Sequence, residues 1–281
     1  MAEARILYIA TAAGLIQLAN PGKSDRWREV GRALSGQDLH AVIASPNDPL
    51  LALAASAAGI SRSTNGGMSW EPVSPEPTRS LVFDATGALY AGADSGAILT
   101  SADGETWTEA ARLSTPILRW SSLPNGTLLG VGGDGRVYER LADGWHARDL
   151  GDLNVLHLAS DPDEPESLLL AGAESLRTAE GSYPLPAAAT GALLMLSGQR
   201  PVLLIGTQEQ LLRSEDRGAT LTPLEGPRAV TVLVTPPRFI DQAFAGTEAG
   251  ALWFSSDRGR TWAELRSGYS AIRDIAFARA L

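Results

Sequence analysis

Cysteine is absent from the 281-residue sequence. Disulfide bridges, thiolate metal sites and cysteine nucleophiles are therefore excluded. The three histidines, His40, His146 and His157, are not spaced like metal ligands, and we expect neither a metal nor another cofactor. The absence of cysteine is typical of a reducing compartment such as the cytoplasm.

Basic residues are also scarce. The chain has 23 Lys and Arg against 32 Asp and Glu, a formal net charge of -9, and its only lysine is Lys23. Nucleic-acid-binding domains usually carry a basic patch or stripe, so we expect no nucleic-acid partner. The preference for Arg over Lys, together with abundant Ala, indicates a GC-rich bacterial genome.

Long hydrophobic runs are missing as well. No apolar stretch reaches the ~20 residues that a membrane-spanning helix needs. The segment from Met1 to Tyr8 contains an early acid and lacks the basic region of a signal peptide. We therefore expect a monomeric cytoplasmic protein without a membrane span. A leader that was removed from the chain is the alternative.

What the chain does contain is a repeat. Segments Ser63–Trp70 and Ser255–Trp262 both follow the pattern S-x-[DN]-x-G-x-[ST]-W. Segment Ser214–Leu221 differs only in its final Leu, and Thr100–Trp107 keeps the Gly, Thr and Trp with Asp103 displaced by one position. Because such repeats define whole architectures, their period decides the fold prediction.

The last residue of the pattern recurs along the entire chain. The series is Trp27, Trp70, Trp107, Trp145, Tyr183, Leu221 and Trp262, with spacings of 37 to 43 residues. Short apolar runs broken by Gly, Pro, Asp and Asn lie between these positions, which indicates strands rather than helices. A period of about 40 residues with short strands is typical of four-stranded propeller blades.

The two ends of the chain predict how the ring closes. The N-terminal runs Ile6–Ala10, Gly14–Leu18 and Trp27–Val30 match the second, third and fourth strands of a blade. The run Ala271–Ala278 matches a first strand. We therefore expect the C-terminal strand to complete the N-terminal blade, which leaves no free inner edge.

The predicted fold is all-β: one domain, residues 1–281, forming a seven-bladed β-propeller of four-stranded antiparallel blades. The expected blades are approximately 1–30 plus 270–281, 37–73, 78–110, 115–149, 153–186, 190–224 and 229–265.

The repeated turn has a structural explanation. Its Asp or Asn accepts backbone hydrogen bonds, its Gly adopts angles that other residues resist, and its Trp buries a large ring between blades. One acid per blade cannot converge on one substrate. The residues to which we assign this structural role are Ser63, Asn65, Gly67, Trp70, Asp103, Trp107, Asp216, Gly218, Asp257, Gly259 and Trp262.

These turns resemble the Asp box of the bacterial neuraminidase repeat superfamily. That superfamily includes sialidases, sortilin-type receptors and photosystem II stability/assembly factor-like propellers. The segments Ser63–Trp70 and Ser255–Trp262 carry the resemblance, and Ala44–Pro49 followed by Gly59–Ser63 looks most like the assembly-factor branch. The resemblance covers nearly the whole chain and implies the fold more than a function.

Sialidase chemistry is not implied. The resemblance would require an Arg-Ile-Pro segment near the start, and the chain has Arg5-Ile6-Leu7 instead. Sialidases use six blades, whereas this chain has seven repeats. No sialidase residue is therefore transferred to this sequence.

Polar residues on first strands mark a candidate site at the mouth of the central channel. Alignment of the first strands places Arg119, His157 and Asp274 at one level, near Ser80 and Thr231. The alternative is that these polar residues are solvated strand ends. The candidate ligand-binding residues are Arg119, His157, Asp274, His40, Arg79, Trp120 and Arg273, and Trp120 is either a stacking platform or core.

Two functions follow from this site. We expect a non-catalytic binding or assembly scaffold that uses a propeller face or the channel mouth, with a protein partner or a small or carbohydrate ligand. The alternative is an enzyme, a glycoside hydrolase or lyase acting on a small polar or anionic substrate. Convergence of Arg119, His157 and Asp274 within hydrogen-bonding reach would favour the enzyme.

The structural role of the terminal aromatic leads to a stability prediction. If the Trp262 ring belongs to the core, the substitution Trp262→Ala should lower the free energy of unfolding by about 3–5 kcal/mol. Urea unfolding of the purified variant measures this difference. A loss within about 0.5 kcal/mol would show that the ring is exposed.

Overall fold

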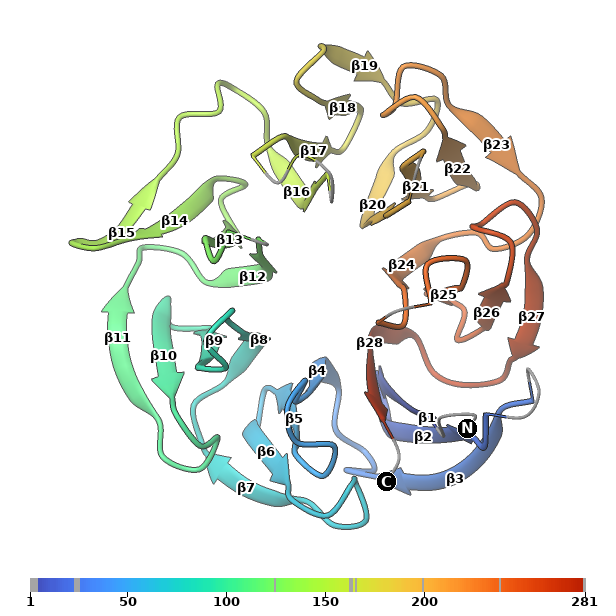
Figure 1. The fold of residues 1–281 in the computed structure, drawn as a ribbon. Helices are drawn as coiled ribbons and strands as arrows, with labels where there is room; N and C mark the ends of the chain where they lie inside the picture. Colours follow the sequence, from blue (N-terminus) through green and yellow to red (C-terminus); the bar gives the residue numbers. More distant parts are fainter. Residues whose placement is uncertain are drawn as a thin grey trace.

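The computed structural model describes residues 5–22, 26–123, 125–161, 164, 166–198, 200–237 and 239–279. Residues 1–4 and 280–281 of the predicted first blade, and Lys23, lie outside this set. The described residues form seven four-stranded antiparallel sheets arranged as a ring around a central channel (Figure 1). The predicted all-β, seven-bladed propeller is therefore confirmed. No helix long and apolar enough to cross a membrane occurs among the described residues.

The seven sheets are numbered here as blades 1 to 7, and each is given from its inner to its outer strand. Blade 1 is β28 (Ile272–Arg279), β1 (Arg5–Thr11), β2 (Gly14–Asn20) and β3 (Arg28–Ala33). Blade 2 is β4 (Leu39–Ala44), β5 (Ala52–Ser56), β6 (Gly59–Ser63) and β7 (Glu71–Ser74). Blade 3 is β8 (Thr78–Phe83), β9 (Leu89–Ala93), β10 (Ala97–Ser101) and β11 (Thr108–Arg112).

The remaining four blades follow in chain order. Blade 4 is β12 (Ile117–Ser122), β13 (Leu128–Gly132), β14 (Val137–Leu141) and β15 (Gly144–Ala147). Blade 5 is β16 (Val155–Ser160), β17 (Leu168–Gly172), β18 (Ser175–Arg177) and β19 (Ser182–Pro184). Blade 6 is β20 (Ala189–Leu196), β21 (Val202–Thr207), β22 (Leu211–Ser214) and β23 (Thr222–Leu224). Blade 7 is β24 (Val230–Val234), β25 (Ala243–Thr247), β26 (Leu252–Ser255) and β27 (Ala263–Arg266).

Blade 1 closes the ring from both ends of the chain, as predicted. Strand β28 pairs antiparallel with β1, with Ile275 opposite Ile9. Figure 1 shows β28, the last strand of the chain, on the inner side of β1 and β2. The ring is therefore held together by an antiparallel ladder between segments at opposite ends of the chain, and the inner edge of β1 is paired.

Burial falls from the second strand of each blade to the fourth. The second strands are short runs of apolar and small residues, and β5, β9, β13 and β25 are buried at every position. The outer strands are polar, and β11 is exposed at four of its five positions. This gradient follows from the wedge shape of a blade, because inner and middle strands are covered by both neighbouring blades and outer strands face solvent.

The core is divided among the contacts between blades. Seven hydrophobic clusters occur among the described residues, and each contains residues from two adjacent blades. One cluster, for example, joins Leu7 and Trp27 of blade 1 to Val232 and Phe244 of blade 7. Each blade thus buries its two apolar faces only against its neighbours.

The repeated turns connect the third and fourth strands and are held by their own side chains. In the blade 7 turn, Ser255 Oγ accepts the backbone N–H of Gly259, and Asp257 Oδ1 accepts that of Thr261. The Trp262 Nε1–H donates to the Gly259 carbonyl. Ser214 and Asp216 make the equivalent bonds in blade 6.

The glycine of this turn meets two requirements at once. Gly218 has a φ of 97°, which favours glycine, and a Cβ there would lie 2.2 Å from Leu176 Cδ2 in blade 5. In the same way, a Cβ on Gly67 would lie 2.7 Å from a ring carbon of Tyr8 in blade 1. The turn therefore packs against the preceding blade, where a side chain has no room.

The recurring aromatics do not all lie in the core. All seven residues of the series, six aromatics and Leu221, lie at or next to the start of an outer strand. Trp27 is 2% exposed, whereas Trp262 is only partly buried. Trp27 packs edge-to-face on Phe244 at 5.4 Å between ring centroids. The expectation of a core ring thus holds for Trp27 and only in part for Trp262.

This difference revises the stability prediction. Trp27→Ala should lower the free energy of unfolding by about 3–5 kcal/mol, because a fully buried ring and its aromatic contacts are lost. Trp262→Ala should cost about 1–3 kcal/mol, because part of that ring already contacts water. Urea unfolding of the two variants side by side measures the difference, and equal losses would contradict it.

Candidate functional site

Every inner strand is irregular at the same end of the channel. The pairing register of all seven inner strands with the adjacent strand shifts near its start, which indicates a β-bulge. The shift places an extra residue at the mouth of the channel. In six strands this is a single residue: His40, Arg79, Leu118, Leu156, Thr231 and Arg273.

Polar side chains at or next to these bulges connect neighbouring blades. Ser80 Oγ donates to the Ile117 carbonyl at 2.5 Å, and Thr231 Oγ1 donates to the Ile272 carbonyl at 2.5 Å. Thr190 Oγ1 donates to the Val230 carbonyl. Each of these bonds runs from one inner strand to the backbone of the next, so it stabilises the contact between two blades.

Three predicted site residues belong to the same set. His40 Nδ1 lies 2.9 Å from the Thr78 carbonyl, and His157 Nδ1 lies 2.7 Å from the Gly191 carbonyl. The carboxylate of Asp274 accepts the backbone N–H of Val42 at 3.0 Å. Six of the seven junctions between inner strands therefore carry such a side-chain bond.

The two bulge arginines are held in ion pairs at the mouth. The Arg79 guanidinium pairs with the Asp94 carboxylate, and its Nη1 lies 3.3 Å from His40 Nε2. Arg273 lies 3.5 Å from both Asp38 and Glu248. Sequence reasoning did not find the three acids, because they come from loops that the strand alignment does not cover.

Trp120 packs in the contact between blades 3 and 4, although it also borders the inner channel cavity. Its ring packs against Trp145 at 5.5 Å and Tyr90 at 6.4 Å between centroids, in the cluster between blades 3 and 4. Of the two interpretations that the sequence leaves open, this placement favours core over a stacking platform.

Arg119 differs from the rest of the set. It occupies the junction between blades 4 and 5, and it makes no hydrogen bond or ion pair within the described part of the chain. Its guanidinium reaches past blade 5 to blade 6, because a Cβ built on Gly191 would lie 3.6 Å from Arg119 Nη2. Arg119 lines both channel cavities, which have volumes of about 630 and 410 Å³.

The charge of Arg119 acts through space on His157 and on Asp274, without direct bonding. Burial lowers the pKa of Arg119, and the charge of Asp274 opposes this effect. Burial and the nearby Arg119 cation lower the pKa of His157 to about 3. Burial raises the pKa of Asp274 to about 6, although two backbone N–H groups and Arg119 favour its charged form. No hydrogen bond joins any two of these residues in the described structure.

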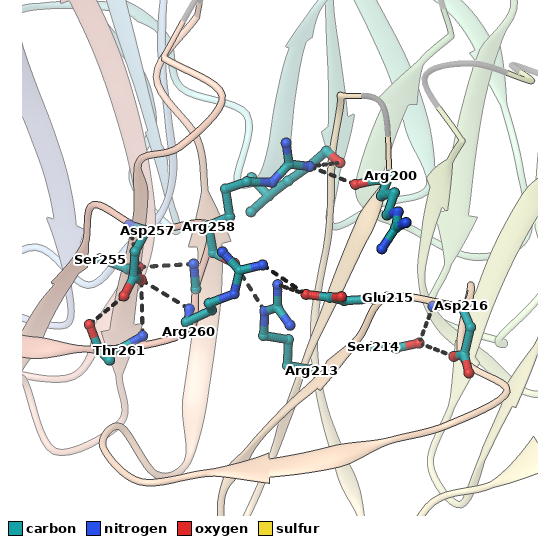
Figure 2. Close-up of polar contacts among 12 residues, drawn as sticks. Arg200, Arg213, Ser214, Glu215, Asp216, Ser255, Asp257, Arg258, Arg260 and Thr261 are labelled. Carbon is teal, nitrogen blue, oxygen red and sulfur yellow. Dashed lines mark hydrogen bonds and ion pairs between the residues drawn. The ribbon is translucent and has the colours of Figure 1, made fainter.

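A second polar cluster lies at the rim, where blades 6 and 7 meet (Figure 2). The carboxylate of Glu215 accepts hydrogen bonds from Arg213 at 2.7 Å and from Arg260 at 3.1 Å. Arg258 donates to the Ser197 and Arg200 carbonyls at 2.9 and 2.8 Å, which fixes the loop that carries Arg200. We call Arg200, Arg213, Arg258 and Arg260 the rim arginine cluster.

Sequence reasoning missed this cluster. The sequence pattern that could have predicted it lies in the variable positions of the repeated turns. Arg258 and Arg260 occupy two such positions in one turn, and Glu215 occupies one in another. A hollow of about 730 Å³ adjoins the cluster and is lined by Arg200, Arg213, Glu215, Asp216, Thr220 and Thr222. Within the described ranges, no group of three His, Asp or Glu side chains is arranged to hold a metal ion.

Comparison with known proteins identifies the fold but no family. No family model and no curated protein matches the chain. A chain of the mitotic checkpoint complex matches with a TM-score of 0.64 and 14% identity, over 86% of this chain and 83% of the other. YCF48 bound to D1 peptide matches with a TM-score of 0.59 and 16% identity, over 92% and 82%.

A third solved structure is an enzyme by its description. Dihydro-heme d1 dehydrogenase NirN matches with a TM-score of 0.62 and 13% identity, over 96% of this chain and 74% of the other. At such identities the likeness shows the shared fold alone, because one fold carries many functions.

The opposite pKa shifts of Asp274 and His157 predict opposite effects of pH on stability. The folded-state pKa of Asp274 is raised from 3.8 to about 6, so this residue lowers stability as pH rises through that window. The folded-state pKa of His157 is lowered from 6.5 to about 3, so this residue lowers stability as pH falls below about 6.5.

Asp274→Asn should therefore gain stability relative to the wild type as pH rises from about 4 to about 6. His157→Gln should gain stability relative to the wild type as pH falls from about 6 to about 4. Each change should be on the order of 1 kcal/mol. Urea unfolding of the three proteins at several pH values measures both, and parallel stability curves would contradict the assignment.

Proposed function

We propose that this chain is a non-catalytic protein-binding scaffold whose contact surface includes the rim arginine cluster. One observation carries the proposal. In a chain with a net charge of -9, the guanidinium groups of Arg213 and Arg260, from two adjacent blades, both pair with the carboxylate of Glu215. Arg213 also donates to the Arg258 carbonyl, and Arg258 donates to the Arg200 carbonyl, which links the four arginines of the cluster. The neighbouring Asp216 carboxylate is already occupied by Ser214 and Thr220 in its turn.

The cluster combines one mostly buried, hydrogen-bonded arginine with arginines that are exposed to solvent. The side chain of Arg213 is 11% exposed, whereas that of Arg260 is 59% exposed. Arg200 is also exposed, on a loop whose carbonyls are held by Arg258. A partner thus meets prepositioned cations, which reduces the ordering entropy that binding costs.

The chemistry of the cluster favours an acidic segment of a protein. Guanidinium groups form paired, charge-assisted hydrogen bonds with carboxylates. The adjoining hollow of about 730 Å³ offers room for a short stretch of chain beside them. The propeller of similar fold that is bound to D1 peptide supports a peptide as the kind of ligand for this architecture.

The channel mouth supports a scaffold rather than an enzyme. His157 and Asp274, the candidate acid–base groups, each bond to the backbone of the next blade. These bonds stabilise the contacts between blades. Neither His157 nor Asp274 forms a hydrogen bond with Arg119.

We also propose that the chain is a single-domain member of the Asp-box repeat superfamily, in its assembly-factor-like branch. The hydrogen bonds of Ser214, Asp216, Ser255 and Asp257 within their turns support this assignment. The assignment is consistent with assembly or binding as the activity.

A double charge reversal at the rim tests the function. The variant Arg200→Glu/Arg260→Glu should bind a short fluorescent Asp/Glu-rich peptide at least about tenfold more weakly than the wild type, because attraction is replaced by repulsion. Wild-type binding should also weaken as salt is added. Fluorescence anisotropy measures the affinity, with the Asn/Gln version of the peptide as the neutral comparison.

The matched control is Arg112→Glu, which reverses an exposed arginine of blade 3 that pairs with Glu109. It should leave peptide affinity unchanged within about twofold, because Arg112 lies outside the cluster. Equal weakening by the control and the double variant would show a general charge effect and overturn the proposed surface.

A further inference from the structure

Arg119 is the one cation of the channel mouth that lacks a bonded partner among the described residues. Arg79 pairs with Asp94, and Arg273 pairs with Asp38 and Glu248. Arg119 has no such bond, although its level in the ring matches that of side chains that all bond to the next blade. Its neighbours therefore satisfy their own polar groups and leave the guanidinium available.

The position of Arg119 is set by the chain around it. The guanidinium lies beside Gly191, since a Cβ there would be in ordinary van der Waals contact with Arg119 Nη2 at 3.6 Å and Nε at 3.8 Å. The bulge in β12 next to Arg119 redirects the strand at this point. The guanidinium is thus placed beside the inner surface of blade 6 rather than within a blade contact.

Two cavities meet at Arg119. The outer one, of about 630 Å³, has a lining that includes the polar residues Asn154 and Thr190. The inner one, of about 410 Å³, continues along the inner strands and has a lining to which polar and apolar groups both contribute. Its apolar residues include Val42, Leu81, Phe83, Val234 and Phe277.

We propose that the channel binds a small organic carboxylate, whose carboxylate pairs with Arg119 and whose apolar part enters the inner cavity. A guanidinium and a carboxylate match in geometry and form two parallel hydrogen bonds. One unpaired cation balances one negative charge, which selects a monoanion. The apolar residues of the inner cavity offer contacts to a hydrocarbon or aromatic body, as in other small-molecule sites.

The Asp274 carboxylate competes with such a ligand for interaction with the Arg119 cation. Its carboxylate is the acid whose charge acts on Arg119 through space, and it forms no bond with it. An incoming carboxylate replaces this distant attraction with direct hydrogen bonds. Removal of the Asp274 charge should therefore tighten binding, whereas removal of the Arg119 charge should abolish it.

Benzoate is a suitable probe because it combines a monoanionic carboxylate with an aromatic ring. Its neutral counterpart benzamide has the same shape, acetate lacks the ring, and inorganic phosphate is an anion of another class. Isothermal titration calorimetry of the full chain should show binding of benzoate, weaker binding of acetate, and no detectable binding of benzamide. Tighter binding of phosphate than of benzoate would overturn the carboxylate assignment.

Variants at the two charged residues complete the test. Arg119→Gln should weaken benzoate binding at least about tenfold, since a charge-assisted hydrogen-bond pair is lost. Asp274→Asn should strengthen it. The matched control Arg112→Gln removes an exposed arginine that pairs with Glu109 and lines neither cavity, and it should leave the affinity within about twofold. Equal affinity of wild type and Arg119→Gln would refute the proposal, as would a loss in both Arg119→Gln and Asp274→Asn.

Circular dichroism and thermal unfolding establish that each variant is folded. If Arg119→Gln does not fold, Arg119→Lys takes its place, because it keeps the charge and loses the paired N–H geometry. It should bind benzoate several-fold more weakly than the wild type, and unchanged affinity would overturn the site. This outcome is separate from peptide binding at the rim, which none of the channel variants should alter.

Discussion

The packing of each blade against its two neighbours is the interaction on which this protein depends. The hydrophobic core is shared among seven clusters, and each cluster draws on two blades. A blade that lost one neighbour would expose an apolar face, so the ring must close. The ladder between β28 and β1 meets this need by joining the two ends of the chain in one sheet.

The same constraint governs the polar residues around the channel. Bulges on the inner strands place polar side chains at the junctions, where most of them bond to the backbone of the next blade. In such a ring, polar side chains on the inner strands form hydrogen bonds between blades, because a buried polar group needs a hydrogen-bond partner. Arg119 departs from this arrangement, and its lack of a bonded partner among the described residues is the observation on which the proposed channel site rests.

The turns at the rim show how a structural element also shapes a surface. The Ser and Asp of each turn satisfy its backbone, and its glycine packs against the preceding blade. The variable positions of the turn are then free to differ without damage to the fold. In blades 6 and 7 these positions carry Glu215, Arg258 and Arg260, which bring a cationic cluster to the rim of an acidic protein.

The sequence by itself determined the all-β class, the seven blades and the closure by the C-terminal strand, because turn chemistry and strand alternation are local and repeat along the chain. The predicted run Gly14–Leu18 lies within β2 for this reason. Alignment of the first strands also predicted that Arg119, His157 and Asp274 occupy equivalent positions around the channel. Only the tertiary structure decided that His157 and Asp274 bond to the next blade, that Trp262 stays partly exposed, and that Arg258 bonds to the carbonyl of Arg200. These outcomes depend on contacts between blades, which join residues that are distant in the sequence and share no local pattern.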